Sequence, residues 1–177
     1  MRPAYRSHFA IILFACWCVS GSTAAAAELH ALVTEGLQLA YNLDHEAAIA
    51  KLTKAVQVYP DNPVGHRSLA ATVWLQLLFS RRSLLVDNYL TGSISRPTGD
   101  LKPPPKELDQ LFEKHIERAI ALSERAIKLS PNDVNAHYEL GIAVGLAASY
   151  RASIRGQTFQ PCATRNARTV LTSAYSN

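Results

Sequence analysis

Hydrophobic residues recur every three or four positions along most of the chain, which is the period of an α-helix rather than of a β-strand. The first clear stripe consists of Leu29, Leu32, Val33, Leu37 and Ala40. A second stripe follows in residues 45–59, and Pro60 ends it because proline cannot continue a helical hydrogen-bond ladder. Later stripes predict helices over about 63–89, 106–129 and 134–154. The pattern therefore predicts an all-α fold of helical hairpins.

One part of this pattern occurs twice. The segment DHEAAIAKLTKAVQVYP ends at Pro60, and its counterpart HIERAIALSERAIKLSP ends at Pro131, 71 residues later. Small residues lie at matching positions, Ala48 and Ala55 in the first copy and Ala119 and Ala126 in the second. An internal repeat of this kind is typical of proteins that stack helical hairpins into an array.

The first copy resembles a known family. Its matching residues are Leu32, Gly36, Leu39, Ala48, Leu52, Ala55 and Pro60. This spacing resembles the tetratricopeptide repeat, a helix–turn–helix of about 34 residues. Counting from Pro60 places repeats at residues 29–62 and 63–133 and a partial repeat at 134–155, within a helical domain of residues 28–155. Glu35 and Ser123 depart from the family pattern, which prefers large apolar residues there.

The second repeat is too long for a simple hairpin, so we place an insertion at residues 80–112. The apolar pattern predicts that its first helix continues to about Tyr89, followed by a proline-containing loop over 91–105. The return helix would begin near Lys106. Leu77, Leu78, Leu84 and Leu85 would then pair with Leu108, Leu111 and Phe112 in an antiparallel helical arm.

The first 27 residues have the features of a secretory signal. Arg2 and Arg6 precede an apolar run at residues 9–19, and alanines at 25–27 predict cleavage before Glu28. We therefore expect an exported protein, periplasmic or secreted, with no stable membrane span after signal removal. A retained membrane anchor and a lipoprotein modified at Cys16 are alternatives. Cys162 would be the one cysteine of the mature chain, so no internal disulfide is expected.

The segment 156–177 departs from the repeat pattern. Gly156 and Pro161 interrupt it, and the second helix of the third repeat does not appear where the spacing requires it. We therefore interpret 156–177 as an irregular tail, and the chain as a truncated or frame-shifted relative of a longer repeat protein.

Charge and motifs exclude several functional classes. The net charge is +4, and without Arg2 and Arg6 it becomes +2, with basic residues scattered rather than gathered in a stripe. We therefore expect no nucleic acid partner. No nucleophile motif or phosphate-binding loop is present, so we expect no enzymatic activity and no cofactor. His30, His45 and His115 lack partners at ligand spacing, and packing or capping roles are expected for His66 and His137, which predicts no metal site.

The remaining candidate is a groove. The family resemblance implies that inward positions on the first helix of each repeat line a concave peptide-binding surface. In this chain they are Val33, Leu37, Tyr41, Arg67, Ala71, Trp74, Asn135, Tyr138 and Ile142. Only Arg67 and Asn135 resemble the basic and amide clamp of chaperone-binding relatives, so we do not expect that partner.

We therefore expect a protein- or peptide-binding scaffold. The alternatives are a structural remnant without a binding role and a non-catalytic accessory subunit of an envelope complex. As a further alternative, the helices of the insertion would cover the groove. The sequence leaves the oligomeric state open.

Overall fold

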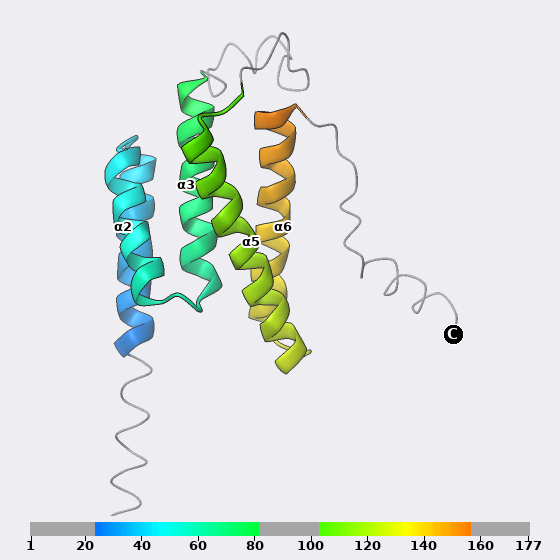
Figure 1. Ribbon diagram of the computed structural model, residues 1–177. Coiled ribbons are helices and arrows are strands. Elements are labelled where there is room, and N and C mark those ends of the chain that lie inside the picture. The colour runs from blue at the N-terminus through cyan, green and yellow to red at the C-terminus, as the bar shows by residue number, and fades with distance from the viewer. Residues whose placement is uncertain (1–23, 82–102, 157–177) are drawn as a thin grey trace, which may run out of the picture.

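The computed structural model describes residues 24–81 and 103–156, which form α-helices joined by turns, with no strand among these residues (Figure 1). An initial helix at 24–41 precedes four labelled helices. These are α2 (His45–Val58), α3 (Pro63–Ser80), α5 (Lys106–Leu129) and α6 (Val134–Arg155). The predicted all-α fold is confirmed.

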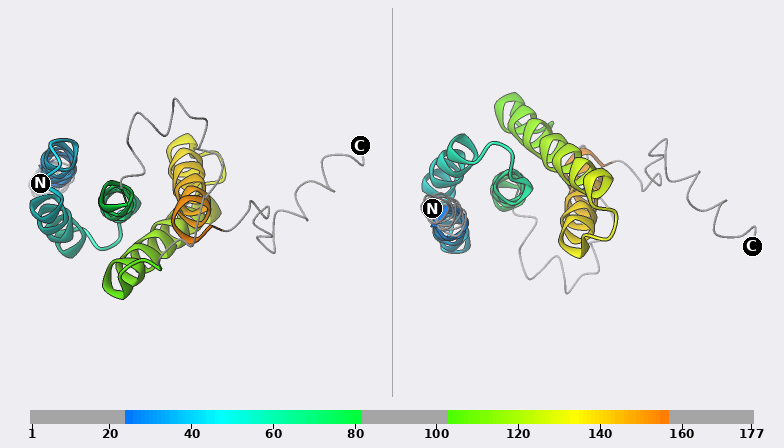
Figure 2. Two further views of the ribbon diagram at one scale, coloured as in Figure 1. Left: turned by 90° about the horizontal axis from the view of Figure 1, so that it is seen from above. Right: turned by 90° about the horizontal axis from the view of Figure 1, so that it is seen from below.

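The helices lie side by side in chain order. The initial helix and α2 form a hairpin, and α3 packs between α2 on one side and α5 and α6 on the other (Figure 2). The core runs through all of these elements. Its largest fully buried side chains include Leu52, Leu69, Phe112 and Tyr150.

The α2–α3 and α5–α6 junctions share their boundaries and hydrogen bonds at the same 71-residue offset. Asn62 caps α3 by accepting from the Val64 N–H at 3.0 Å, and Asp133 caps α6 by accepting from the Asn135 N–H at 2.9 Å. The Nε2 atom of His66 lies 3.0 Å from the Pro60 carbonyl oxygen. The repeat-equivalent pair, His137 and Pro131, makes the same contact at 2.8 Å. Both histidines thus bind the turn that precedes their own helix.

Small residues allow the helices to approach closely. A methyl group added at Gly36 would lie 2.6 Å from Cγ of Leu52, so α2 packs directly against the backbone of the initial helix. Ala48, Ala55 and Ala119 are completely buried. Ser123 is buried too, and its hydroxyl donates to the Ala119 carbonyl oxygen at 2.9 Å. This bond within the helix lets a polar residue occupy a position that the repeat pattern assigns to a large apolar one.

The predicted extension of the second-repeat helix is wrong in its length. Helix α3 ends at Ser80 rather than near Tyr89, and Arg81 caps it by donating its N–H to the Leu77 carbonyl oxygen. The Arg81 guanidinium also donates to the Ile154 carbonyl oxygen at 2.7 Å, which ties the end of α3 to α6. This contact across the interface cannot be read from local periodicity.

The base of the predicted arm is nevertheless packed. Leu77, Leu78 and Phe112 are buried, and Leu108 and Leu111 pack against the same core. Leu84, Leu85 and most of the 91–105 loop lie outside the described residues, while 103–105 are non-helical.

Predictions about the two ends also fall largely outside the described residues. The described part of the initial helix starts at residue 24, so it includes the predicted cleavage point before Glu28. The signal segment, Cys16, Cys162 and the irregular tail after Gly156 lie in 1–23 and 157–177, which the structure does not describe. Within 24–81 and 103–156, no helix is both long enough and apolar enough to span a bilayer.

Candidate functional site: the predicted groove

The initial helix contributes two of its three predicted groove residues to the surface. Tyr41 is 88% exposed and Leu37 is 40% exposed. Val33 is only 6% exposed and belongs to the hydrophobic core, so its assignment to the groove lining is wrong. Its position faces the neighbouring helices that complete the core.

On α3, two of the three predicted groove residues contact α6. The Nε atom of Arg67 donates to Oε2 of Glu139 at 2.6 Å, and both side chains are largely shielded from solvent. Arg67 is therefore already paired and is not available as a free carboxylate clamp. The indole N–H of Trp74 donates to the Ser153 hydroxyl at 2.9 Å. Ala71 is half-buried against the core.

On α6, the predicted residues remain more open. Asn135 is exposed, Tyr138 is 64% exposed, and Ile142 is half-buried. The structure thus brings the α3 and α6 parts of the predicted groove together through the Arg67–Glu139 and Trp74–Ser153 contacts. What reaches solvent is a set of aromatic and aliphatic side chains on the initial helix and α6.

The structure also pairs two histidines that the sequence treats separately. His66 on α3 and His115 on α5 are both 6% exposed, with their Nδ1 atoms 2.8 Å apart and their rings stacked. The Pro60 carbonyl can only accept, so Nε2 of His66 carries a proton and donates to it. In the neutral pair, Nδ1 of His66 therefore accepts and Nδ1 of His115 donates.

Burial governs the protonation of this pair. Burial, together with the smaller effects of the nearby His66 and Lys114, lowers the pKa of His115 to about 4. Burial likewise lowers the pKa of His66, with Arg118 and Lys114 acting in the same direction. The Pro60 hydrogen bond and Asp61 oppose the shift at His66. Both rings are therefore neutral near pH 7 and hold α3 against α5.

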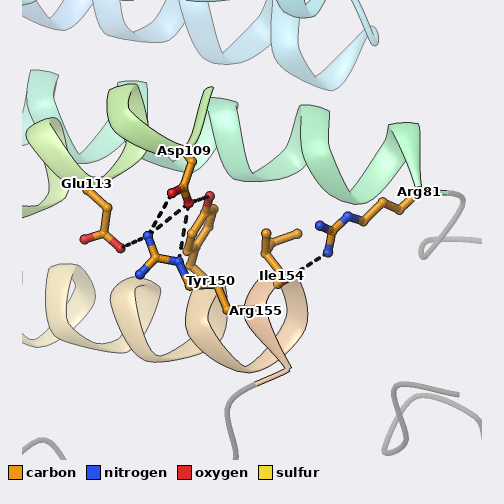
Figure 3. Close-up of polar contacts among 6 residues, drawn as sticks. All are labelled: Arg81, Asp109, Glu113, Tyr150, Ile154 and Arg155. Carbon is orange, nitrogen blue, oxygen red and sulfur yellow. Dashed lines mark hydrogen bonds and ion pairs between the residues drawn. The ribbon is translucent and has the colours of Figure 1, made fainter. Parts of the chain in front are cut away.

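A second polar cluster joins the first turns of α5 to the end of α6 (Figure 3). The Tyr150 hydroxyl donates to Asp109 at 2.7 Å, and Arg155 binds both carboxylate oxygens of Asp109 at 3.0 Å. Arg155 also lies 2.9 Å from Glu113 as an ion pair. The Tyr150 ring stacks on Phe112, with centroids 3.6 Å apart. Burial and the Asp109 hydrogen bond raise the pKa of Tyr150 above its ordinary range, which keeps the phenol protonated.

Both clusters lie at helix–helix interfaces, the first between α3 and α5 and the second between α5 and α6. No group of three or more metal-ligating side chains gathers in the described ranges 24–81 and 103–156. His45 is buried with its ring 5.7 Å from that of Phe79, and His137 is exposed against Pro131. The sequence offers one indication of the His66–His115 pair, because the two residues lie on the two helices predicted for the second repeat.

No protein-family model, curated protein or solved structure matches this chain.

Proposed function

We propose that this chain is an exported, non-catalytic scaffold that binds a protein or peptide on a surface formed by tetratricopeptide-like hairpins. The observation that carries the proposal is the exposure of large apolar side chains at predicted groove positions, above all Tyr41 and Leu37 on the initial helix. Aromatic side chains contribute strongly to protein interfaces because they combine apolar area with a polar tip. The recurrence of the α2–α3 junction and its cap in the α5–α6 junction, 71 residues later, supports the repeat interpretation.

The internal contacts of the groove favour an apolar ligand over an acidic one. Arg67 is paired with Glu139, so a ligand carboxylate would have to compete with an ion pair already formed. Leu37 and Tyr41 offer apolar area without a fixed charge at 40% and 88% exposure. We therefore expect ligands that present aliphatic or aromatic side chains, and we do not propose a terminal-carboxylate clamp.

A displayed random-peptide library, selected on the purified chain, tests this function. The double variant Leu37→Ser and Tyr41→Ser should reduce the affinity of selected peptides at least tenfold. Leu129→Ser provides the matched control because Leu129 is 76% exposed but lies outside the predicted groove. Peptides that bind all three proteins equally, or a library from which no binder is recovered, would contradict the proposed surface.

A further inference from the structure

Helix α6 presents a stripe of uncovered residues. Val134 and Tyr138 are 77% and 64% exposed, and Gly141 and Gly145 follow on the same side of the helix. A methyl group added at either glycine would meet no atom within 4 Å. This α6 face therefore has room for another helix to approach its backbone closely.

The initial helix carries the corresponding stripe, but there it is covered. Its members are Leu29, Val33, Gly36 and Ala40, each 105 residues before its α6 counterpart, and all four are buried. The glycine comparison is the most direct. A methyl group at Gly36 would collide with Leu52 of α2, whereas Gly141 faces open space. The two stripes differ because α2 follows the initial helix, while α6 is the last helix that the structure describes.

The chain itself contains a segment that matches the covering helix. Beyond α6, Ala167, Leu171 and Ala174 have the intervals of four and three residues that separate Ala48, Leu52 and Ala55 on α2. In α2 this small–large–small arrangement places Leu52 on Gly36. Antiparallel pairing in the same register would place Leu171 on Gly141 and Ala167 on Gly145.

The connection is long enough for this pairing. Gly145 and the helix-ending Gly156 are separated by about 16 Å of helical rise. Residues 157–166 can span roughly 30 Å when extended, so Ala167 can reach back to Gly145. Pro161 falls within this connection, where it interrupts no helix of the proposed pairing.

We propose that residues 164–175 dock as a helix on the Val134–Tyr138–Gly141–Gly145 face of α6, with Leu171 seated on Gly141. This replaces the interpretation of the tail as wholly irregular for those residues. It does not depend on the proposed ligand-binding function, whose test uses the initial helix. Docking would cover Tyr138 and confine the exposed groove to the side of Leu37 and Tyr41.

Disulfide trapping in the full chain tests this arrangement. Cys16, Cys18 and Cys162 are first replaced by serine, and Gly145→Cys is combined with Ala167→Cys. The matched control combines Gly145→Cys with Thr169→Cys, which places the second thiol on the opposite side of the docked helix. Circular dichroism of each reduced variant verifies that it is folded.

We expect the 145–167 pair to form an intramolecular disulfide at least tenfold faster than the 145–169 pair, independently of protein concentration. Equal rates would show an undirected tail and overturn the proposal. Disulfide-linked dimers in place of the internal crosslink would identify a second copy as the occupant and also overturn it. Adding Leu171→Asp to the 145–167 pair should bring its rate down to that of the control. If the rate is unchanged, Leu171 does not anchor the segment.

Discussion

The Nδ1 atoms of His66 and His115 lie 2.8 Å apart across the α3–α5 interface, at a distance where one ring must donate and the other accept. This arrangement tolerates one shared proton but not a proton on both facing nitrogens. Lys114 and Arg118 add positive charge nearby, with Asp61 as the opposing carboxylate. The interface therefore depends on the neutral state of buried imidazoles.

Stability should fall on acidification through this pair. The folded-state pKa of His115 is about 4, below the value near 6.5 of an unfolded histidine, so the unfolded chain binds the proton more readily. The contribution is complete above about pH 6.5, is lost as pH falls toward about 4, and then levels off. We expect a loss on the order of 1–3 kcal/mol, measured by urea unfolding across this range.

The variant His115→Asn should flatten this acid limb, which is the fall in the free energy of unfolding as the pH is lowered. An asparagine amide can replace the donor at Nδ1 but does not titrate in this range. His137→Asn is the matched control, because His137 makes the same contact with a proline carbonyl but is exposed. If His115→Asn lowered stability by the same amount at every pH, titration of His115 would not be the cause of the acid limb.

The contact between Gly36 and Leu52 should make Gly36→Ala destabilising. Alanine normally favours a helix by about 1 kcal/mol over glycine, but here its methyl group would lie 2.6 Å from Cγ of Leu52. Overpacking of about 1–3 kcal/mol should exceed this gain, and chemical denaturation measures the result. Leu52→Ala should relieve the collision, so the double variant should lose less stability than the sum of the two single variants. Strict additivity would mean that the two residues do not touch.

Much of the helical framework was predictable because its signals are local. Periodic apolar residues and the turn at Pro131 predicted a helix from about Lys106 to Leu129, and α5 has these bounds. The N-terminal cap of α2 is equally local, because the Asp44 carboxylate accepts from the Ala47 N–H at 3.4 Å. Each of these features depends on residues a few positions apart.

The groove was less predictable because tertiary contacts decide it. Arg67 and Glu139 are distant in sequence, and nothing local indicates that they form an ion pair. Val33 has the same apolar character whether it lines a groove or fills the core, and only the packing of neighbouring helices distinguishes these roles. The end of α3 is set in the same way by the bond from Arg81 to the Ile154 carbonyl.

Loss of the Asp109 cluster should lower the free energy of unfolding more than loss of the exposed Asp61–Arg118 ion pair. Asp109→Ala removes the acceptor of both Tyr150 and Arg155, and Tyr150 is completely buried. We expect a loss of about 2–4 kcal/mol in the free energy of unfolding, since a buried donor is left unpaired. Asp61→Ala breaks the Arg118 ion pair at 2.7 Å, but those side chains are 76% and 46% exposed. Its cost should stay below about 1 kcal/mol. Equal losses in thermal or urea unfolding would mean that the cluster is no stronger than a solvated pair.

The turn between the initial helix and α2 contains an unfavourable leucine. Leu43 has a φ of 65°, a left-handed conformation that is sterically costly for a residue with a side chain. Its N–H donates to the Ala40 carbonyl oxygen at 3.1 Å, and the next N–H, of Asp44, donates to Leu39 at 3.0 Å. This is the hydrogen-bond pattern of a helix end at which glycine is the usual residue.

Leu43→Gly should therefore raise the free energy of unfolding by about 0.5–1 kcal/mol. The relief of the left-handed strain exceeds the greater conformational freedom that glycine gives to the unfolded chain. Little packing is lost, because Leu43 is 54% exposed. Leu129→Gly is the matched control: Leu129 is also an exposed leucine at the end of a helix, but it does not have a positive φ, and its replacement should be destabilising. Thermal and urea unfolding of both variants measure the difference. A stability loss in Leu43→Gly similar to that of the control would mean that the turn does not hold leucine in a strained conformation.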